Sequence, residues 1–185
     1  DTATRKDDPY EALAESIKET EADGVVLDCS GASTEQLQKA GDNGGNGVVM
    51  FSEGMAVPKD MQGIVSGRVH NALYYCPMLN LNKLIKPEFA IFRVVEVGKE
   101  RIKREYSLSL FNGYGTENNL FSPGRPYWLD EQWKYLARIL MIQRENAGNF
   151  TQQNWIPMLK TAADSIFVNY WPAENKSVYT IFSLV

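Results

Sequence analysis

The sequence contains little cysteine and almost no histidine. Cys29 and Cys76 are its two cysteines, and His70 is its single histidine. Two cysteines outside any CxxC pair are too few for a disulfide framework. One histidine leaves no second imidazole for a histidine-based zinc site or for a Ser-His-Asp triad. We therefore predict no bound metal and no cofactor.

The sequence also lacks an excess of positive charge and any long apolar run. Its formal net charge is -4, whereas nucleic-acid modules usually concentrate lysine and arginine on one face. No apolar run approaches the roughly 20 residues that span a bilayer. The glycine-rich segment 41–47 precedes a strand instead of leading from a strand into a helix, so it does not predict a phosphate site. We predict no nucleic-acid or membrane partner, and a neutral polar ligand fits better.

Two short apolar runs, at residues 24–28 and 47–54, each end in a carboxylate. Their sequences are Gly-Val-Val-Leu-Asp and Gly-Val-Val-Met-Phe-Ser-Glu-Gly, so Asp28 and Glu53 stand at the ends. Both runs are β-rich and too short for buried helices, which predicts interior strands of a parallel sheet. Loops just past the ends of such strands build the active sites of α/β barrels. Asp28 and Glu53 are therefore the candidate catalytic residues.

Helical segments flank these strands and define the fold class. Asp8 is placed to cap a helix over residues 8–22, with Pro9 in its first turn. A second helix is expected over residues 34–40, between the two strands. Strands that alternate with helices predict an α/β fold with a parallel sheet and right-handed crossovers.

The later part of the chain gives mixed signals. We expect a helix within 58–72, an apolar run within 88–97 and a charged helix over 99–105. A strand is expected over 106–111, with a polar loop behind it. A long amphipathic helix over 129–146 and a hairpin of 165–171 with 177–185 are expected after that loop. In the long helix, Trp133, Leu136, Ala137, Leu140 and Met141 are predicted to face the core. The hairpin strands have no helix between them, which indicates that a small, truncated β domain begins near residue 149 or residue 163.

Several motifs together resemble the carboxyl-terminal half of a bacterial glycoside-hydrolase-like (β/α)8 barrel followed by a β-sandwich domain. They are Asp1–Arg5, similar to a WDTGTR-type loop, then 22–28, 52–54, 111–115 with 117–118, and 167–171 with 178–180. The resemblance implies that residues 1–148 form half of a barrel of the TIM type and that residues 149–185 begin the sandwich. It makes Asp28 the nucleophile and Glu53 the acid/base. It also implies that a missing amino-terminal half of the same chain completes the barrel and part of the sugar site.

Glycoside hydrolysis explains why two carboxylates are needed. One donates a proton to the leaving oxygen, and the other attacks the anomeric carbon or activates water. Neighbouring strands lie about 4.8 Å apart, which favours the roughly 5 Å spacing of retaining enzymes. Apolar neighbours of Glu53 suit a proton donor, whereas donors after Asp28 favour its ionised form.

Five further residues are predicted to contact a carbohydrate substrate. They are Asp1, Arg93, Asn112, Glu117 and Trp128. Asn112 and Glu117 fall in the polar loop expected behind residue 111, where Asn-Gly also reads as an ordinary turn. Trp128 offers a ring for a pyranose to stack on.

Other interpretations of the same residues stay open. Asp28 can cap a helix, Glu53 can pair with Lys59, and Cys29 is predicted to pack rather than act as a nucleophile. The protein can be a non-catalytic carbohydrate-binding or structural barrel fragment, or a doubly wound α/β domain with a ligand at its switch point. The sequence leaves the compartment undecided between cytoplasmic and exported. Open sheet edges predict that this segment alone aggregates and is inactive.

Overall fold

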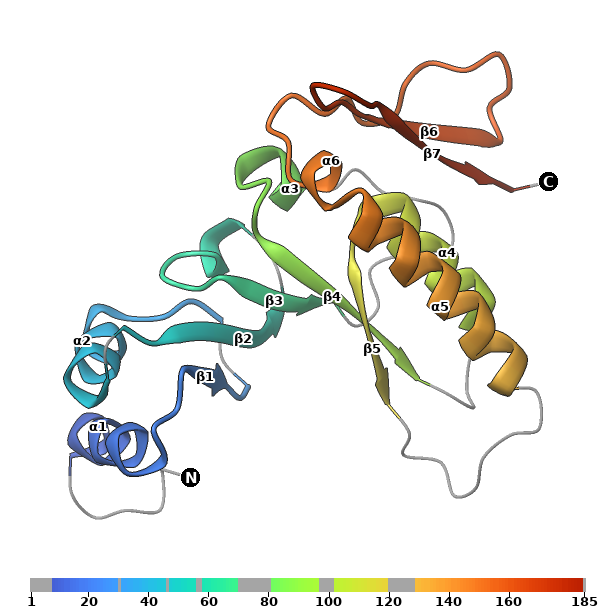
Figure 1. The fold of residues 1–185 in the computed structure, drawn as a ribbon. Coiled ribbons are helices and arrows are strands. Elements are labelled where there is room, and N and C mark those ends of the chain that lie inside the picture. The colour runs from blue at the N-terminus through green and yellow to red at the C-terminus, as the bar shows by residue number, and fades with distance from the viewer. Residues whose placement is uncertain are drawn as a thin grey trace. The chain divides into compact units, whose positions relative to one another are not determined.

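The computed structural model of the chain describes residues 8–29, 31–45, 47–55, 58–69, 81–96, 102–119 and 129–184. The chain divides into two compact units, Asp1–Arg68 and Val69–Val185 (Figure 1). Both units contain parallel strands together with helices, which confirms the α/β class. The described strands do not establish a closed barrel. The predicted boundary between residues 148 and 149 falls inside a helix of the second unit and stays a prediction.

The first unit is a β-α-β arrangement preceded by a helix. Its elements are α1 (Pro9–Thr20), β1 (Gly24–Leu27), α2 (Glu35–Gly44), β2 (Val49–Met55), the 3-10 turn η2 (Pro58–Asp60) and β3 (Ser66–Val69). The Asp8 side chain accepts a hydrogen bond from the Tyr10 amide at 2.9 Å, as its capping position predicts. Thr34 caps α2 in the same way through the Leu37 amide. Helices α1 and α2 lie side by side in Figure 1.

Parallel pairing brings the carboxyl ends of three strands to one edge. Gly24 pairs with Val49 and Leu27 with Ser52, so β1 and β2 run in the same direction. Strand β3 continues the sheet parallel to β2. Asp28, just after β1, and Glu53, in the second half of β2, therefore lie near the same edge, as expected.

The sheet of the first unit has one face turned toward a helix. Met50 points toward α2, and the hydroxyl of Ser33, just before that helix, donates a hydrogen bond to the Met50 sulfur at 3.0 Å. A side chain at Gly41 of α2 would meet the end of Met50 at 3.3 Å. Strand residues alternate between faces, and within this unit Val26 and Val49 are 59% and 54% exposed. The face opposite α2 is therefore apolar and open within the unit.

The predicted helix within 58–72 is wrong. After the single turn of η2, Gly63 adopts a φ of 67°, a left-handed conformation that ends a right-handed helix. The chain then forms β3. The sequence does not mark this strand, because β3 contains a glycine and an arginine where the equally short β1 has an apolar run.

The second unit has two parallel strands, two long helices and a hairpin. Its elements are α3 (Leu81–Ile85), β4 (Ala90–Glu96), α4 (Ile102–Asn112), β5 (Gly115–Asn119), α5 (Leu129–Glu145), α6 (Ala147–Phe150), β6 (Ile166–Trp171) and β7 (Val178–Ser183). Helices α4 and α5 lie side by side (Figure 1). Their shared core contains Val95, Ile102, Tyr106, Leu129, Leu136 and Ile139.

The predicted strand over 106–111 is wrong, because these residues belong to α4. The helix packs against α5 and against the hairpin, so most of its sides are buried and its apolar residues do not keep a helical spacing. Gly113 ends the helix with a φ of 66°, and Tyr114 donates to the Ser109 carbonyl at 2.8 Å. The expected polar loop is also wrong, since Asn112 closes α4 and Glu117 lies in β5.

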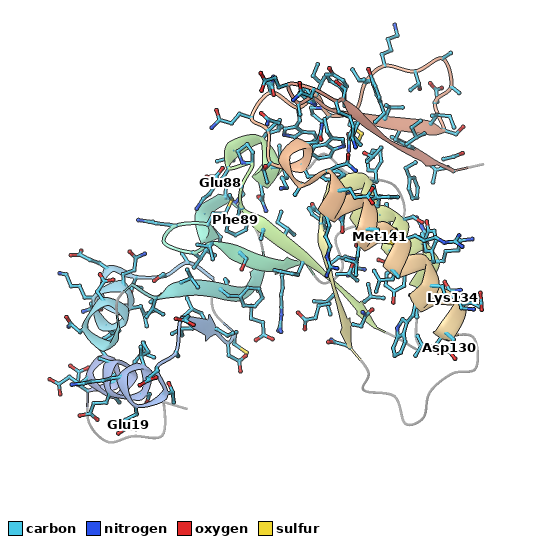
Figure 2. All side chains as sticks on the ribbon, in the orientation of Figure 1. Glu19, Glu88, Phe89, Asp130, Lys134 and Met141 are labelled. Atoms are coloured by element: carbon cyan, nitrogen blue, oxygen red, sulfur yellow. The ribbon has the colours of Figure 1, made fainter. Side chains whose placement is uncertain are left out.

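Helix α5 confirms the long helix predicted over 129–146, and part of its predicted core stripe is wrong. Leu129, Leu136 and Ile139 are buried, whereas Met141 is 58% exposed. Figure 2 labels Met141 between Lys134 and the end of the helix.

Among the described residues, no helix is long and apolar enough to cross a membrane.

The predicted hairpin is confirmed and docks on α4 through buried polar groups. Residues 166–171 pair antiparallel with residues 178–183. Asn169 and Thr180, one from each strand, both donate to the Phe111 carbonyl, at 2.9 and 2.8 Å. Trp171 stacks on Trp155 with ring centroids 4.4 Å apart. A single carbonyl in the last turn of α4, that of Phe111, therefore holds both strands of the hairpin.

Arg93 is buried in the second unit and pairs with Glu105. The Nη2 atom of Arg93 lies 2.6 Å from a carboxylate oxygen of Glu105, and the two side chains are 1% and 4% exposed. This ion pair joins β4 to α4. The prediction that Arg93 contacts the substrate is wrong, because its guanidinium has almost no exposed surface with which to contact a sugar.

Removal of one member of this pair should be costly. We expect Arg93→Met to lower the free energy of unfolding by about 3–5 kcal/mol, because Glu105 is left buried and unpaired. Urea unfolding followed by circular dichroism measures this change. The double variant Arg93→Met/Glu105→Leu should recover most of the loss. Lys134→Met, at a residue labelled in Figure 2, serves as the control, because it opens an exposed ion pair with Glu131 and should cost far less.

Lys83 is a second buried cation in the same unit. Its amine donates to the carbonyls of Pro87 and Phe150, at 2.7 and 2.9 Å. Burial lowers the pKa of Lys83 to about 8, and the charge of Glu88 acts in the opposite direction. The amine thus connects α3 to the end of α6.

Stability should rise with pH because of Lys83. Between pH 8 and its ordinary value of 10.5, the unfolded chain holds more protons than the folded chain. The free energy of unfolding should therefore rise by about 2 kcal/mol from pH 8 to pH 10, and Lys83→Met should abolish this slope. Urea unfolding at each pH, followed by tryptophan fluorescence, compares the two proteins. If the free energy of unfolding rose equally with pH in both proteins, Lys83 would not be the cause of the rise.

Candidate functional site

Asp28 and Glu53 converge at the carboxyl edge of the first unit. One carboxylate oxygen of Asp28, one of Glu53 and the sulfur of Cys29 all lie within 4.8 Å of one another. Asp28 follows the last residue of β1, and Glu53 lies in β2. The prediction that the two carboxylates lie close together is confirmed.

Glu53 stands on a β-bulge. Ser52 pairs with Gly67 of β3, but the next paired residue of β2 is Met55, which lies opposite Arg68. Strand β2 therefore carries extra residues at Glu53 and the position after it. Bulges bend a strand and change the direction of a side chain, and they are frequent beside active sites.

Two donors from the neighbouring strand ends hold the Glu53 carboxylate. The Cys29 amide donates to its Oε2 atom at 2.8 Å. The Arg68 guanidinium, from β3, forms an ion pair with its Oε1 atom, and the same group lies 5.5 Å from the centre of the Phe51 ring. The partner of Glu53 is thus Arg68 and not Lys59. The apolar setting expected for Glu53 is also wrong, because both oxygens accept from polar donors.

The surroundings of Asp28 favour its ionised form. A hydrogen bond with the Glu53 carboxyl is the main cause that holds the pKa of Asp28 below its ordinary value. The thiol and amide of Cys29 and the charge of Arg68 act in the same direction. This direction agrees with the sequence-based expectation that Asp28 is the ionised member of the pair.

Cys29 is exposed, so its predicted packing role is wrong. Its φ of 54° is unusual for a residue other than glycine, and this conformation aims its amide at Glu53. A hydrogen bond to Asp28, with the charges of Asp28 and Glu53, raises the pKa of the Cys29 thiol. A protonated thiol is a poor nucleophile and a poor metal ligand.

The three side chains are of the types that bind metal ions, but their electrostatics oppose a cation. Arg68 already supplies a positive charge to Glu53. The thiol of Cys29 would have to lose its proton against two neighbouring carboxylates. The arrangement is better suited to proton transfer and to nucleophilic attack by a carboxylate.

The other predicted site residues lie elsewhere in the chain. Asn112 is 1% exposed and donates to the Leu108 carbonyl at 3.1 Å, so it closes α4. Glu117 is half-buried in β5, in the second unit. Asp1 and Trp128 lie outside the described residues. The structure brings together Asp28 and Glu53, and it adds Cys29 and Arg68 to them.

Arg68 is not among the predicted site residues, because the sequence pattern favours a helix within 58–72. If residues 58–72 formed a helix, nothing in the sequence would place Arg68 next to Glu53. Recognition of Ser66–Val69 as a third strand would have placed Arg68 near the end of a strand next to β2. The signal was weak, because a glycine and an arginine occupy the middle of this strand.

Removal of Glu53 should raise the pKa of Asp28. Glu53→Ala deletes the main hydrogen bond that favours the ionised form, so the titration midpoint of Asp28 should move up toward its ordinary value. The carboxyl ¹³C shift of Asp28, followed by NMR from pH 2 to pH 7, measures the midpoint in both proteins. Asp42→Asn, on the exposed side of α2, is the control and should leave it unchanged. A midpoint that falls in Glu53→Ala would contradict this reading.

Comparison with known proteins gives no relative to set beside this site. No protein-family model, no curated protein and no solved structure matches the chain. The resemblance to glycoside-hydrolase barrels therefore stays a prediction from the sequence motifs.

Proposed function

We propose that the protein is a glycoside hydrolase that cleaves O-glycosidic bonds with Asp28 and Glu53. The observation that carries the proposal is the approach of their carboxylates to within 4.8 Å at the carboxyl ends of neighbouring parallel strands. Carboxylate oxygens within 4.8 Å of each other are closer than the roughly 6.5–9.5 Å that inverting enzymes leave for a water molecule, so a retaining mechanism fits better.

In the proposed cycle, Asp28 attacks the anomeric carbon while Glu53 gives its proton to the leaving oxygen. The glycosyl group is then bound to Asp28 as an ester, and the aglycone leaves as an alcohol. Glu53, now ionised, takes a proton from water, and the resulting hydroxide releases the sugar. The lowered pKa of Asp28 supports its role as nucleophile.

We further propose that the first unit is part of a (β/α)8 barrel. In such a barrel the helices cover the outside and the sheet encloses the core. Met50 faces α2, whereas the Arg68 guanidinium contacts both Phe51 and Glu53. Phe51 alternates with Met50, so Glu53 projects to the side away from α2. That side corresponds to a barrel interior, where a substrate enters from the carboxyl edge.

A comparison of leaving groups tests the two roles separately, in the longest natural form of the protein. Glu53→Gln should lose about 10²–10⁴-fold in kcat/KM on an alkyl glycoside. It should lose much less on a dinitrophenyl glycoside, because that leaving group needs no proton. Asp28→Asn should lose activity on both substrates, and Asp42→Asn on neither.

The outcome also decides between catalysis and binding. Sugar binding by calorimetry, with no turnover by the unaltered protein, would favour the non-catalytic carbohydrate-binding alternative. Turnover that survives both Asp28→Asn and Glu53→Gln would remove these two residues from the mechanism.

A further inference from the structure

A third side chain, Arg68, completes the carboxyl edge of the first unit. Strands β1, β2 and β3 each contribute one polar group at this edge, namely Asp28, Glu53 and Arg68. The side chains of Arg68 and Glu53 are only 21% and 25% exposed. An ion pair with this degree of burial is less screened by solvent than a surface pair.

Each carboxylate oxygen of Glu53 accepts a hydrogen bond from a different neighbouring strand end. Oε2 accepts from the Cys29 amide after β1, and Oε1 accepts from Arg68 on β3. Two donors on two oxygens define the plane of a carboxylate, which one donor cannot do. Asp28, by contrast, is exposed.

The contact with Phe51 explains why the third side chain is arginine. A planar guanidinium can lie over an aromatic ring and still direct its N–H groups at a carboxylate. Arg68 does both, with its central carbon 5.5 Å from the centre of the Phe51 ring. Lysine carries the same charge, but its ammonium cannot make the planar contact.

We propose that Arg68 is a positioning residue that fixes the orientation of the Glu53 carboxylate for proton transfer. The proposal rests on the hydrolase function proposed above. Misplacement of a catalytic group by about 1 Å can cost roughly 100-fold in rate. Arg68 acts through Glu53 and does not itself contact the substrate. Its loss should therefore lower kcat and leave KM almost unchanged.

The first measurement needs no turnover. In Arg68→Met the Glu53 carboxylate loses one of its two anchors, so the Cys29 amide that binds it should exchange with solvent roughly tenfold faster. Hydrogen exchange by NMR measures this rate. Lys59→Met removes one positive charge from the exposed turn η2 and is the matched control, with no change expected. An unaltered Cys29 exchange rate in Arg68→Met would overturn the proposal.

The second measurement uses glycoside turnover. Arg68→Met should lose about 100-fold in kcat with KM within about threefold. Arg68→Lys, which keeps the charge, should recover part of this loss, and added methylguanidinium should partly restore Arg68→Ala. A loss confined to KM, or an equal loss in Arg68→Met and Arg68→Lys without rescue by methylguanidinium, would overturn the positioning role.

The two measurements separate the two proposals. If the unaltered protein cleaves no glycoside, the hydrolase function fails, while the exchange of the Cys29 amide still tests the hold of Arg68 on Glu53. If the protein cleaves glycosides and the amide does not respond, the positioning role fails and the hydrolase function stands.

Discussion

The parallel direction of β1, β2 and β3 is the constraint on which the proposed site depends. Parallel strands end at the same edge, so residues distant in the sequence are delivered there together. Asp28, Glu53 and Arg68 meet for this reason and not because of any local motif. An antiparallel β2 would place Glu53 at the opposite edge. The caps of α1 and α2 support this arrangement, because they set where each helix begins and hence where each following strand enters the sheet.

The bulge at Glu53 combines strand geometry with electrostatics. It takes Glu53 out of the regular ladder and exposes its carboxylate to donors on both sides. The same carboxylate lies close to Asp28, and like charges at this distance would repel. Arg68 offsets part of that negative charge. Arg68 therefore makes the close carboxylate pair compatible with a folded edge.

The second unit is organised by polar groups buried against backbone carbonyls. Lys83, Asn169 and Thr180 each donate to carbonyls at the ends of helices, which have no partner within the helix. Arg93 pairs with Glu105 within the same interior. Such groups are specific but costly to unpair. This explains why an arginine inside an apolar run serves the fold here, although its sequence context suggested a ligand contact.

The sequence by itself determined the elements whose signals are local. The cap at Asp8, the apolar runs that end in Asp28 and Glu53, the long helix near residues 129–146 and the terminal hairpin all follow from propensity, capping and short-range periodicity. Only the tertiary structure decided the rest. Burial on several sides made residues 106–111 helical despite their alternation, a four-residue strand brought Arg68 to Glu53, and the partner Glu105 drew Arg93 inside. Each of these outcomes depends on contacts between residues far apart in the chain, and no local pattern records such contacts.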